Sequence, residues 1–296
     1  MSRADIKVGF ACNNRCVFCA QGHKRRDIGF IDAAELAGRM RKAFAPGRGL
    51  VLTGGEPTIR RDLVKLVALA RAIGYAPIQV QTNGRMLAYA PLVDRLMRAG
   101  VTEFSPALHG STAAVHDALT AAPGAFDQTV AGIENVARAG GLLLTNTVVV
   151  RDNLSCLEDT IRLLGSLGVR QAQLALVHPV GTAGELYDDI VPPIDEAAEA
   201  MARAIRAGRE LSMRVVTEAV PPCLLPGLED AVVEERIPDT TVVDLDGELF
   251  GFSTWRTDEG KAKGPRCGEC TRDQSCEGPW REYPERFGWD AYRPMA

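Results

Sequence analysis

The chain has 296 residues, of which 46% are hydrophobic and 24% charged, as in a globular protein with room for one α/β domain and a small appendage. Its formal net charge is −4, so no basic field favours a nucleic-acid backbone, and a DNA or RNA substrate is disfavoured. No stretch approaches the roughly 20 apolar residues of a membrane span, and no apolar signal segment is visible, so we expect a cytoplasmic protein with reduced thiols.

Three cysteines follow the first apolar run, Ile6 to Ala11, which we expect to form the first strand. Cys12, Cys16 and Cys19 are spaced Cys-x3-Cys-x2-Cys. Because a 4Fe-4S cluster held by protein takes four thiolates, a local set of three leaves one iron for an outside ligand or a distant fourth cysteine. Zinc is the alternative, but structural zinc usually takes paired ligands with a second pair or a histidine nearby, and only His23 is close.

The second expected strand, Gly49 to Thr53, runs directly into the tetrapeptide Gly54-Gly55-Glu56-Pro57. Taken alone, this tetrapeptide predicts only a tight turn between a strand and a helix. Glycine supplies unusual backbone angles there, and proline starts the next element.

Together, the cysteine spacing and this tetrapeptide resemble the signature motifs of the radical S-adenosylmethionine (SAM) enzymes, including the aromatic Phe18 just before the last cysteine. The resemblance implies that SAM chelates the open iron through its amino and carboxylate groups. Electron transfer from the cluster then cleaves SAM to methionine and a 5'-deoxyadenosyl radical. The resemblance also implies that the backbone of residues 54–57 and the Glu56 carboxylate hold the SAM amino group, because such oxygens accept the protons of an ammonium.

Four further strands are expected at 78–82, 101–108, 142–150 and 171–177, with helices between the strands. This alternation predicts a parallel sheet with right-handed crossovers. The family resemblance sharpens the expected fold to a partial (β/α)6 TIM-like barrel with a small C-terminal iron-sulfur extension.

Chemistry in such sheets takes place at the carboxyl ends of the strands. Ser105, Asn146 and Arg151 are therefore candidates for contacts to the SAM ribose or carboxylate, and Asn83 lies in a Thr-Asn-Gly turn that is typical of the family. His109 also occupies a strand end, where a histidine serves either as a hydrogen-bonding loop residue or in proton transfer.

A second group of cysteines lies in a C-terminal region rich in glycine, proline and charge. Cys267, Cys270 and Cys276 are spaced Cys-x2-Cys-x5-Cys, and Cys223 lies upstream of them. Together they offer four thiolates for one fully ligated 4Fe-4S cluster or, alternatively, for one zinc ion. A metal centre would stabilise a segment that cannot build much core of its own, because site assembly and folding are coupled.

When it follows a radical SAM barrel in the sequence, the Cys-x2-Cys-x5-Cys spacing is similar to that of the SPASM and Twitch auxiliary-cluster extensions. The full SPASM pattern has seven cysteines and two clusters, so four cysteines resemble the shortened, Twitch-like form with one second, auxiliary 4Fe-4S cluster. We expect a radical SAM core at 1–211 and a SPASM/Twitch-like extension at 212–296. If Cys223 is not a ligand, the resemblance implies an open iron that can bind substrate.

The resemblance implies an enzyme that receives an electron from a donor such as a flavodoxin or ferredoxin and abstracts a hydrogen atom from its substrate. The second cluster would accept an electron, giving a net oxidation of a peptide. Many relatives that modify ribosomal peptides carry an added peptide-binding domain, whereas the first strand is expected here by about residue 6, so a small-molecule substrate is an alternative. A non-catalytic iron-sulfur electron-transfer protein and a zinc-stabilised binding module are alternatives of other classes.

Overall fold

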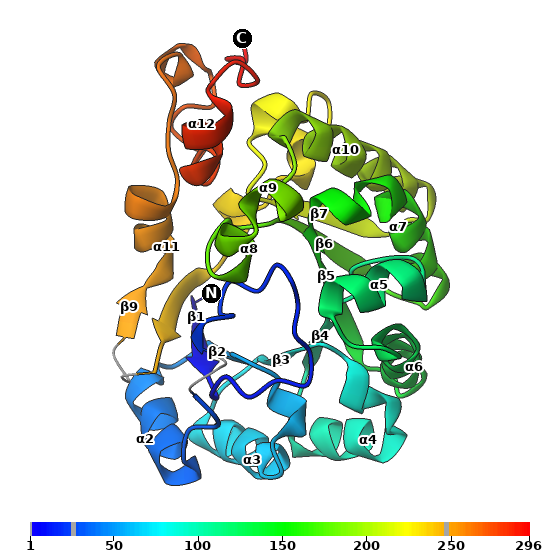
Figure 1. The fold of residues 1–296 in the computed structure, drawn as a ribbon. Coiled ribbons are helices and arrows are strands. Elements are labelled where there is room, and N and C mark those ends of the chain that lie inside the picture. The colour runs from blue at the N-terminus through cyan, green and yellow to red at the C-terminus, as the bar shows by residue number, and fades with distance from the viewer. Residues whose placement is uncertain (1, 25–27, 246–248) are drawn as a thin grey trace.

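The computed structural model describes residues 2–24, 28–245 and 249–296. Over this part of the chain, the strands form one nine-stranded sheet that curves into an open barrel with helices on its outer side (Figure 1). Neighbouring strands are parallel, except for the antiparallel pair β8 and β9. This arrangement confirms the predicted α/β fold with a partial TIM-like barrel. The spatial order is β7 (Arg214–Glu218), β6 (Gln171–Leu176), β5 (Leu142–Val149), β4 (Glu103–Pro106), β3 (Ile78–Thr82), β2 (Gly49–Thr53), β1 (Ser2–Lys7), β8 (Asp239–Val243) and β9 (Leu249–Gly251).

Amphipathic helices connect the strands and cover the outer side of the sheet. In the first of them, the Asp32 side chain accepts hydrogen bonds from the backbone N–H groups of Ala34 and Glu35, so the helix begins where the sequence places an N-cap. The main helices are α2 (Ala33–Ala43), α3 (Leu63–Ile73), α4 (Ala90–Ala99), α5 (Ala113–Thr120), α6 (Ala125–Arg138), α7 (Leu157–Ser166) and α10 (Ile194–Glu210). Shorter helices are α8 (Thr182–Glu185), α9 (Tyr187–Ile190), α11 (Phe252–Trp255) and α12 (Glu282–Phe287).

The two faces of each strand differ in polarity. In β6, Ala172, Leu174 and Leu176 are buried in the core, whereas Gln171 and Gln173 line the inside of the barrel. Successive side chains of a strand point to opposite faces, so this alternation places apolar residues against the helices and polar residues inside the barrel.

The first strand lies earlier than predicted, at Ser2–Lys7 rather than at 6–11. The regular ladder with β2 ends where Lys7 pairs with Thr53. Gly9 follows with a φ of +122°, and a Cβ there would lie 2.4 Å from the Gly29 carbonyl oxygen. The prediction was wrong because apolar residues in 8–11 leave the sheet to begin the cysteine loop.

Residues beyond the six expected barrel strands extend the same sheet at both edges. β7 pairs with β6, and β8 pairs with β1. The expected boundary at residue 211 therefore falls just before a strand that joins the barrel sheet. The C-terminal segment with α11 and α12 lies along the open side of the barrel (Figure 1). None of the helices described in 2–24, 28–245 and 249–296 is long and apolar enough to cross a membrane.

Candidate active site

A cavity of about 660 Å³ occupies the inside of the open barrel and reaches the carboxyl ends of its strands. The structure brings both groups of motif residues to this one cavity, although the motifs are far apart in sequence. The predicted site residues that line it are Cys12, Cys16, Cys19, Gly54, Gly55, Glu56, Asn83, Ser105 and Asn146.

Backbone hydrogen bonds hold the cysteine loop, residues 12–19, between two neighbouring segments. The Arg15 N–H donates to the carbonyl oxygen of Thr120 at the end of α5, over 2.8 Å. On another side, the Thr182 N–H at the start of α8 donates to the Cys19 carbonyl oxygen over 3.0 Å. The loop is therefore fixed by the protein itself, which pre-organises its three thiols at the cavity.

The backbone of residues 54–57 lies directly against the segment that leads into the cysteine loop. The Gly55 N–H donates to Gly9 O and the Glu56 N–H to Ala11 O, each over 2.8 Å. A Cβ on Gly55 would stand 2.3 Å from Ala11 O, so the close approach of the two backbones requires glycine.

The Glu56 carboxylate is buried and lines the cavity. Its Oε1 accepts hydrogen bonds from the Thr58 N–H (2.9 Å), the Thr58 hydroxyl and the Thr82 hydroxyl (2.6 Å). Its Oε2 accepts one from the Asn83 N–H (2.6 Å), which leaves this oxygen with further acceptor capacity. Burial raises the pKa of Glu56 despite these four donors.

The turn after β3 ties the cysteine loop to the rest of the cavity wall. The Asn83 side-chain amide donates to Asn13 Oδ1 over 2.6 Å. The Arg85 guanidinium donates to Asn13 O (2.5 Å) and Asn14 Oδ1 (2.9 Å). The sequence reasoning missed Arg85, which places a positive charge beside the loop, where charge and hydrogen bonds tune a cluster.

Three further candidates have different positions. Ser105 is buried on β4, and Asn146 faces the cavity from β5. Among the described residues, no group donates a hydrogen bond to the buried Oδ1 of Asn146. Arg151 is exposed outside the cavity wall, and its guanidinium donates to Val191 O over 2.9 Å. The structure does not bring Arg151 to the other candidates, because residues 151–156 turn into a 3₁₀-helix directly after β5.

Phe18 and Pro57 are buried and do not line the cavity. The Phe18 ring packs edge-to-face on His109 with ring centroids 4.7 Å apart, and His109 stacks on His116 at 5.7 Å. His109 Nδ1 accepts the Val148 N–H, and burial lowers the pKa of His109 well below its usual range. The aromatic residue of the cysteine loop therefore packs on a neutral histidine.

Polar residues inside the barrel were also missed. They occupy alternate positions of several strands, and that period of two was the available signal. Gln79, for example, donates to Glu103 Oε2 over 2.8 Å. The set that lines the cavity includes Arg3, Asp5, Gln79, Gln81, Gln171, Gln173, Arg214 and Glu218.

A second cavity, of about 690 Å³, lies in the C-terminal part of the chain. Cys223, Cys267, Cys270 and Cys276 all line it, so the structure brings the four tail cysteines together. Burial first, and then the neighbouring thiols, raise the pKa of Cys223 to about 11. A bound cation would counteract both effects, because metal coordination deprotonates a thiol.

Each of the four tail sulfurs accepts a backbone N–H hydrogen bond. The donors to Cys267 and Cys276 are Gly264 (3.2 Å) and Gly278 (3.3 Å). The donors to Cys270 and Cys223 come from the C-terminal segment, namely Met295 (3.3 Å) and Arg293. Similarly, the Asn14 N–H donates to Cys12 Sγ over 3.4 Å. Such donors stabilise the charge of a thiolate ligand and set cluster potentials.

Sulfur donors line both cavities. Within residues 2–24, 28–245 and 249–296, no three His, Cys, Asp or Glu side chains are grouped around one point to hold a single metal ion. The thiols are instead distributed around cavity walls, three in the first cavity and four in the second. Thiolates are the ligands that iron-sulfur clusters take, and a set of four also suits a zinc ion.

Comparison with known proteins agrees with this arrangement. A model of the Radical SAM superfamily matches residues 6–164. An AdoMet-dependent heme synthase of Oleidesulfovibrio alaskensis is 31% identical over 187 residues, covering 62% of this chain and 48% of that protein. A probable GTP 3',8-cyclase of Saccharolobus islandicus is 32% identical over 191 residues, covering 62% and 61%. The chain thus spans about half the length of the curated relatives it matches.

Solved structures resemble the fold over nearly the whole chain. Streptococcus suis SuiB bound to precursor peptide SuiA has a TM-score of 0.63 at 15% identity, covering 93% of this chain and 69% of that one. Native anSMEcpe with bound AdoMet has a TM-score of 0.66 at 13% identity, covering 95% and 90%. The family model spans more than half of the chain and contains both motifs that meet at the barrel cavity, so this chain belongs to the radical SAM superfamily of enzymes.

Proposed function

We propose that this chain catalyses the net oxidation of a peptide, with SAM cleaved at a first 4Fe-4S cluster to supply a hydrogen-abstracting 5'-deoxyadenosyl radical and with a second 4Fe-4S cluster to accept an electron. The observation that carries the proposal is the pair of cysteine-lined cavities, one in the barrel and one in the C-terminal segment. Residues 1–211 form the catalytic core in this account, and residues 212–296 form a SPASM/Twitch-like extension.

In the first cavity, Cys12, Cys16 and Cys19 hold the cluster and leave one iron to SAM. The backbone at Gly54–Pro57 and the remaining acceptor site on Glu56 Oε2 receive the SAM ammonium. Asn83, Ser105 and Asn146 lie around the same cavity as donors and acceptors for the rest of SAM. Phe18 supports the loop from behind, and the polar barrel wall orients the substrate and excludes bulk water.

In the second cavity, Cys223, Cys267, Cys270 and Cys276 supply four thiolates, so that every iron of the cluster has a protein ligand. The C-terminal segment contributes two of the N–H donors to these sulfurs. Aromatic residues that precede this segment in the sequence anchor it to the barrel. Tyr283 is fully buried, and its hydroxyl donates to Val177 O at the end of β6 over 3.3 Å. This packing supports a fixed distance between the two centres.

A peptide substrate is supported by fold neighbours whose structures contain peptides: SuiB with precursor peptide SuiA, and anSMEcpe with AdoMet and Cp18Cys peptide. A small-molecule oxidation is the second candidate. It is favoured by the cavity volume of about 660 Å³, which lies within the range of small-molecule sites, and by relatives that are a heme synthase and a probable GTP cyclase. A flavodoxin or ferredoxin is the proposed electron donor.

Anaerobic incubation with SAM and dithionite, followed by chromatography for 5'-deoxyadenosine, tests the catalytic part of the proposal. The wild type should release 5'-deoxyadenosine, and a Cys12→Ala, Cys16→Ala, Cys19→Ala variant should release none. The matched control is Cys156→Ala, which removes a thiol that lines neither cavity and should remain active. Reduced, iron-loaded protein that never releases 5'-deoxyadenosine, with or without candidate substrates, would favour an electron-transfer protein.

A further inference from the structure

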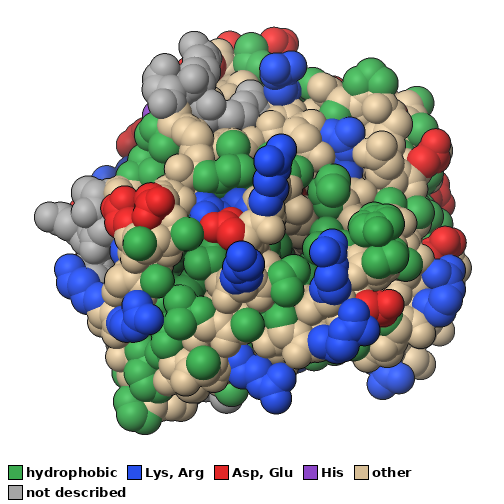
Figure 2. Space-filling model, turned by 90° about the horizontal axis from the view of Figure 1, so that it is seen from below, with side chains coloured by type: hydrophobic (Ala, Val, Ile, Leu, Met, Phe, Trp, Pro, Cys, Tyr) green, Lys and Arg blue, Asp and Glu red, His purple; other side chains and the backbone are tan. Residues whose placement is uncertain are grey.

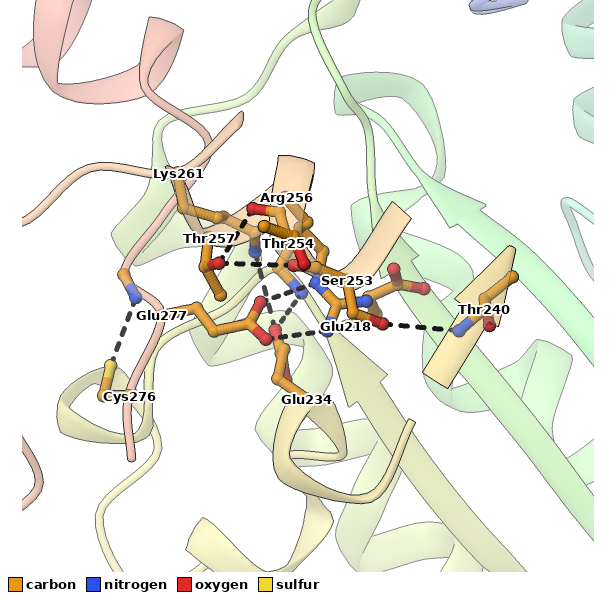
Figure 3. A network of polar contacts seen from close by, with 12 residues as sticks. Glu218, Glu234, Thr240, Ser253, Thr254, Arg256, Thr257, Lys261, Cys276 and Glu277 are labelled. Carbon is orange, nitrogen blue, oxygen red and sulfur yellow. Dashed lines mark hydrogen bonds and ion pairs between the residues drawn. The ribbon is translucent and has the colours of Figure 1, made fainter. Parts of the chain in front are cut away.

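A cluster of charged side chains, those of Glu218, Glu234, Arg256, Lys261 and Glu277, lies in one region of the molecule (Figure 3). Glu218, at the end of β7, and Arg256 line the barrel cavity. Glu277 directly follows Cys276, which lines the second cavity. Glu234 and Lys261 lie beside them, and both are buried. The cluster thus forms part of the barrel wall on the side of the proposed second cluster.

Two of the three acids in this cluster have a cation of their own. Arg256 donates two hydrogen bonds to Glu277, over 2.6 and 2.7 Å. The Lys261 ammonium lies 3.6 Å from Glu234 Oε1, which also accepts the Ala219 N–H. Neither cation forms an ion pair with Glu218 among the described residues, although Arg256 Nη1 and Lys261 Nζ are buried without a hydrogen-bond partner there and both cations lower the pKa of Glu218.

Glu218 is the acid that remains. Its carboxylate accepts a hydrogen bond from the Gln173 side-chain amide. Within the described ranges of the chain, no Lys, Arg or His nitrogen forms an ion pair with it. The Glu218 side chain is half-buried and lines the barrel cavity. The apolar side chains of Val216 and Phe252 line the same cavity. Keeping a carboxylate ionised beside an apolar surface costs free energy when it forms no ion pair. A positively charged ligand would reduce this cost.

We propose that Glu218 binds the ammonium group of a lysine side chain in the substrate peptide, with the lysine methylenes along Val216 and Phe252. This inference rests on the proposed function, because it requires a peptide in the barrel cavity. A charge-assisted hydrogen bond from an ammonium to a half-buried carboxylate is among the stronger polar contacts in proteins, so it selects lysine over an uncharged side chain of equal length.

The charges around Glu218 act on its pKa in both directions. Burial raises the pKa of Glu218, and the nearby Glu234 and Glu277 act in the same direction, whereas Lys261 and Arg256 oppose them. The sum of these five groups is one excess negative charge when all are ionised. A ligand cation would balance that charge, and acidification that protonates Glu218 would weaken lysine binding.

The test uses three fluorescein-labelled, capped pentapeptides that differ only at the central residue, which is lysine, norleucine or glutamate. Binding is measured anaerobically by fluorescence anisotropy with the iron-reconstituted full chain and SAM. The wild type should bind the lysine peptide about tenfold tighter than the norleucine peptide, and the glutamate peptide weakest. Equal affinity for lysine and norleucine, or no measurable binding of any of the three, would overturn the proposal, and this comparison needs no variant.

Variants then assign the preference to Glu218. Glu218→Gln keeps an oxygen to accept the Gln173 amide, so it should lose the lysine preference and keep the norleucine affinity. Glu218→Asp should retain part of the preference. Glu134→Gln on the exposed side of α6 removes the same charge elsewhere and should bind as the wild type does. A lysine preference that survives in Glu218→Gln contradicts the assignment.

The same preparations separate this inference from the function on which it rests. Release of 5'-deoxyadenosine without any lysine preference means that the radical function stands and the cation site fails. A Glu218-dependent lysine preference without 5'-deoxyadenosine means that the cation site stands and the catalytic proposal fails.

Discussion

The backbone of Gly55 lies so close to Ala11 that a β-carbon on Gly55 would stand 2.3 Å from the Ala11 carbonyl oxygen. The neighbouring N–H of Glu56 donates to this same oxygen over 2.8 Å. This contact fixes the distance between the two motifs of the family, so the position of the cysteine loop depends on the absence of a side chain at residue 55.

Gly55→Ala should therefore displace the cysteine loop or the end of β2, because the atoms in conflict are backbone atoms that cannot rotate away. We expect a loss of about 2 kcal/mol or more in the free energy of unfolding and weaker SAM binding, measured by denaturant titration and equilibrium dialysis. The control is Gly38→Ala in α2, where an added Cβ meets nothing within 4 Å; it should stabilise the protein by about 0.5–1 kcal/mol. Equal effects of the two substitutions would contradict the account.

Glu56→Gln should disturb both the turn after β3 and SAM binding. The amide NH₂ would face groups that now donate to the carboxylate, namely Thr58, Thr82 and the Asn83 N–H. A buried donor left without an acceptor costs about 1–3 kcal/mol, and the remaining acceptor for the SAM ammonium is weakened. Calorimetry of SAM binding should show at least a tenfold loss of affinity, while exposed Glu134→Gln binds normally; unchanged affinity in Glu56→Gln would exclude the carboxylate from SAM binding.

The stability of the barrel should fall on mild acidification because His116 is buried as a neutral imidazole. Burial lowers the pKa of His116 to about 4, below the 6.5 of an unfolded chain. The unfolded state therefore takes up the proton first, and the stabilisation present above pH 6.5 is lost as the pH falls toward 4. This group alone contributes a loss of about 2 kcal/mol by pH 5.

Urea unfolding at pH 7 and pH 5 checks this prediction. His116→Asn keeps an acceptor for the His109 N–H and removes the proton uptake, so its stability should depend less on pH than that of the wild type. Exposed His23→Asn is the control and should follow the wild type. If the stability of His116→Asn depends on pH as strongly as that of the wild type, a group other than His116 causes the loss of stability in acid.

Arg256→Met should destabilise the chain strongly, because it leaves the Glu277 carboxylate without the two hydrogen bonds of its partner. Breaking a buried ion pair from one side costs about 3–5 kcal/mol. Surface Arg266→Met breaks a pair with Glu269 and should cost less than about 1 kcal/mol. Thermal unfolding compares the two variants directly, and a similar shift in both would mean that the Arg256 pair is not effectively buried.

In the view from below, Lys and Arg side chains are spread over the face of the molecule among apolar and acidic ones (Figure 2). By contrast, Glu234, Arg256 and Lys261 of the charged cluster near Glu218 are buried.

The sequence predicted most of the barrel because its strands are short apolar runs separated by amphipathic helices. Gly49–Thr53 and Ile78–Thr82 have the predicted bounds. The first strand was misplaced because Gly9 ends the ladder within a continuous apolar run, and hydrophobic periodicity does not register a positive φ.

Local spacing also predicted the cysteine and glycine motifs, since each is a short segment whose residues act together. It could not predict that Glu218, Arg256 and Lys261 lie in one cluster, because segments far apart in the sequence bring them together. The same holds for the N–H groups of Arg293 and Met295 at the tail sulfurs. Such contacts depend on tertiary packing rather than on a local pattern.

The most direct test of the account is iron and sulfide counting on anaerobically reconstituted protein, with zinc measured in parallel. Two 4Fe-4S clusters predict about eight irons in the wild type and about four in Cys267→Ala, Cys270→Ala, Cys276→Ala, with no bound zinc. About four irons in the wild type, unchanged in that variant or accompanied by one zinc, would contradict the second cluster and the oxidative function built on it.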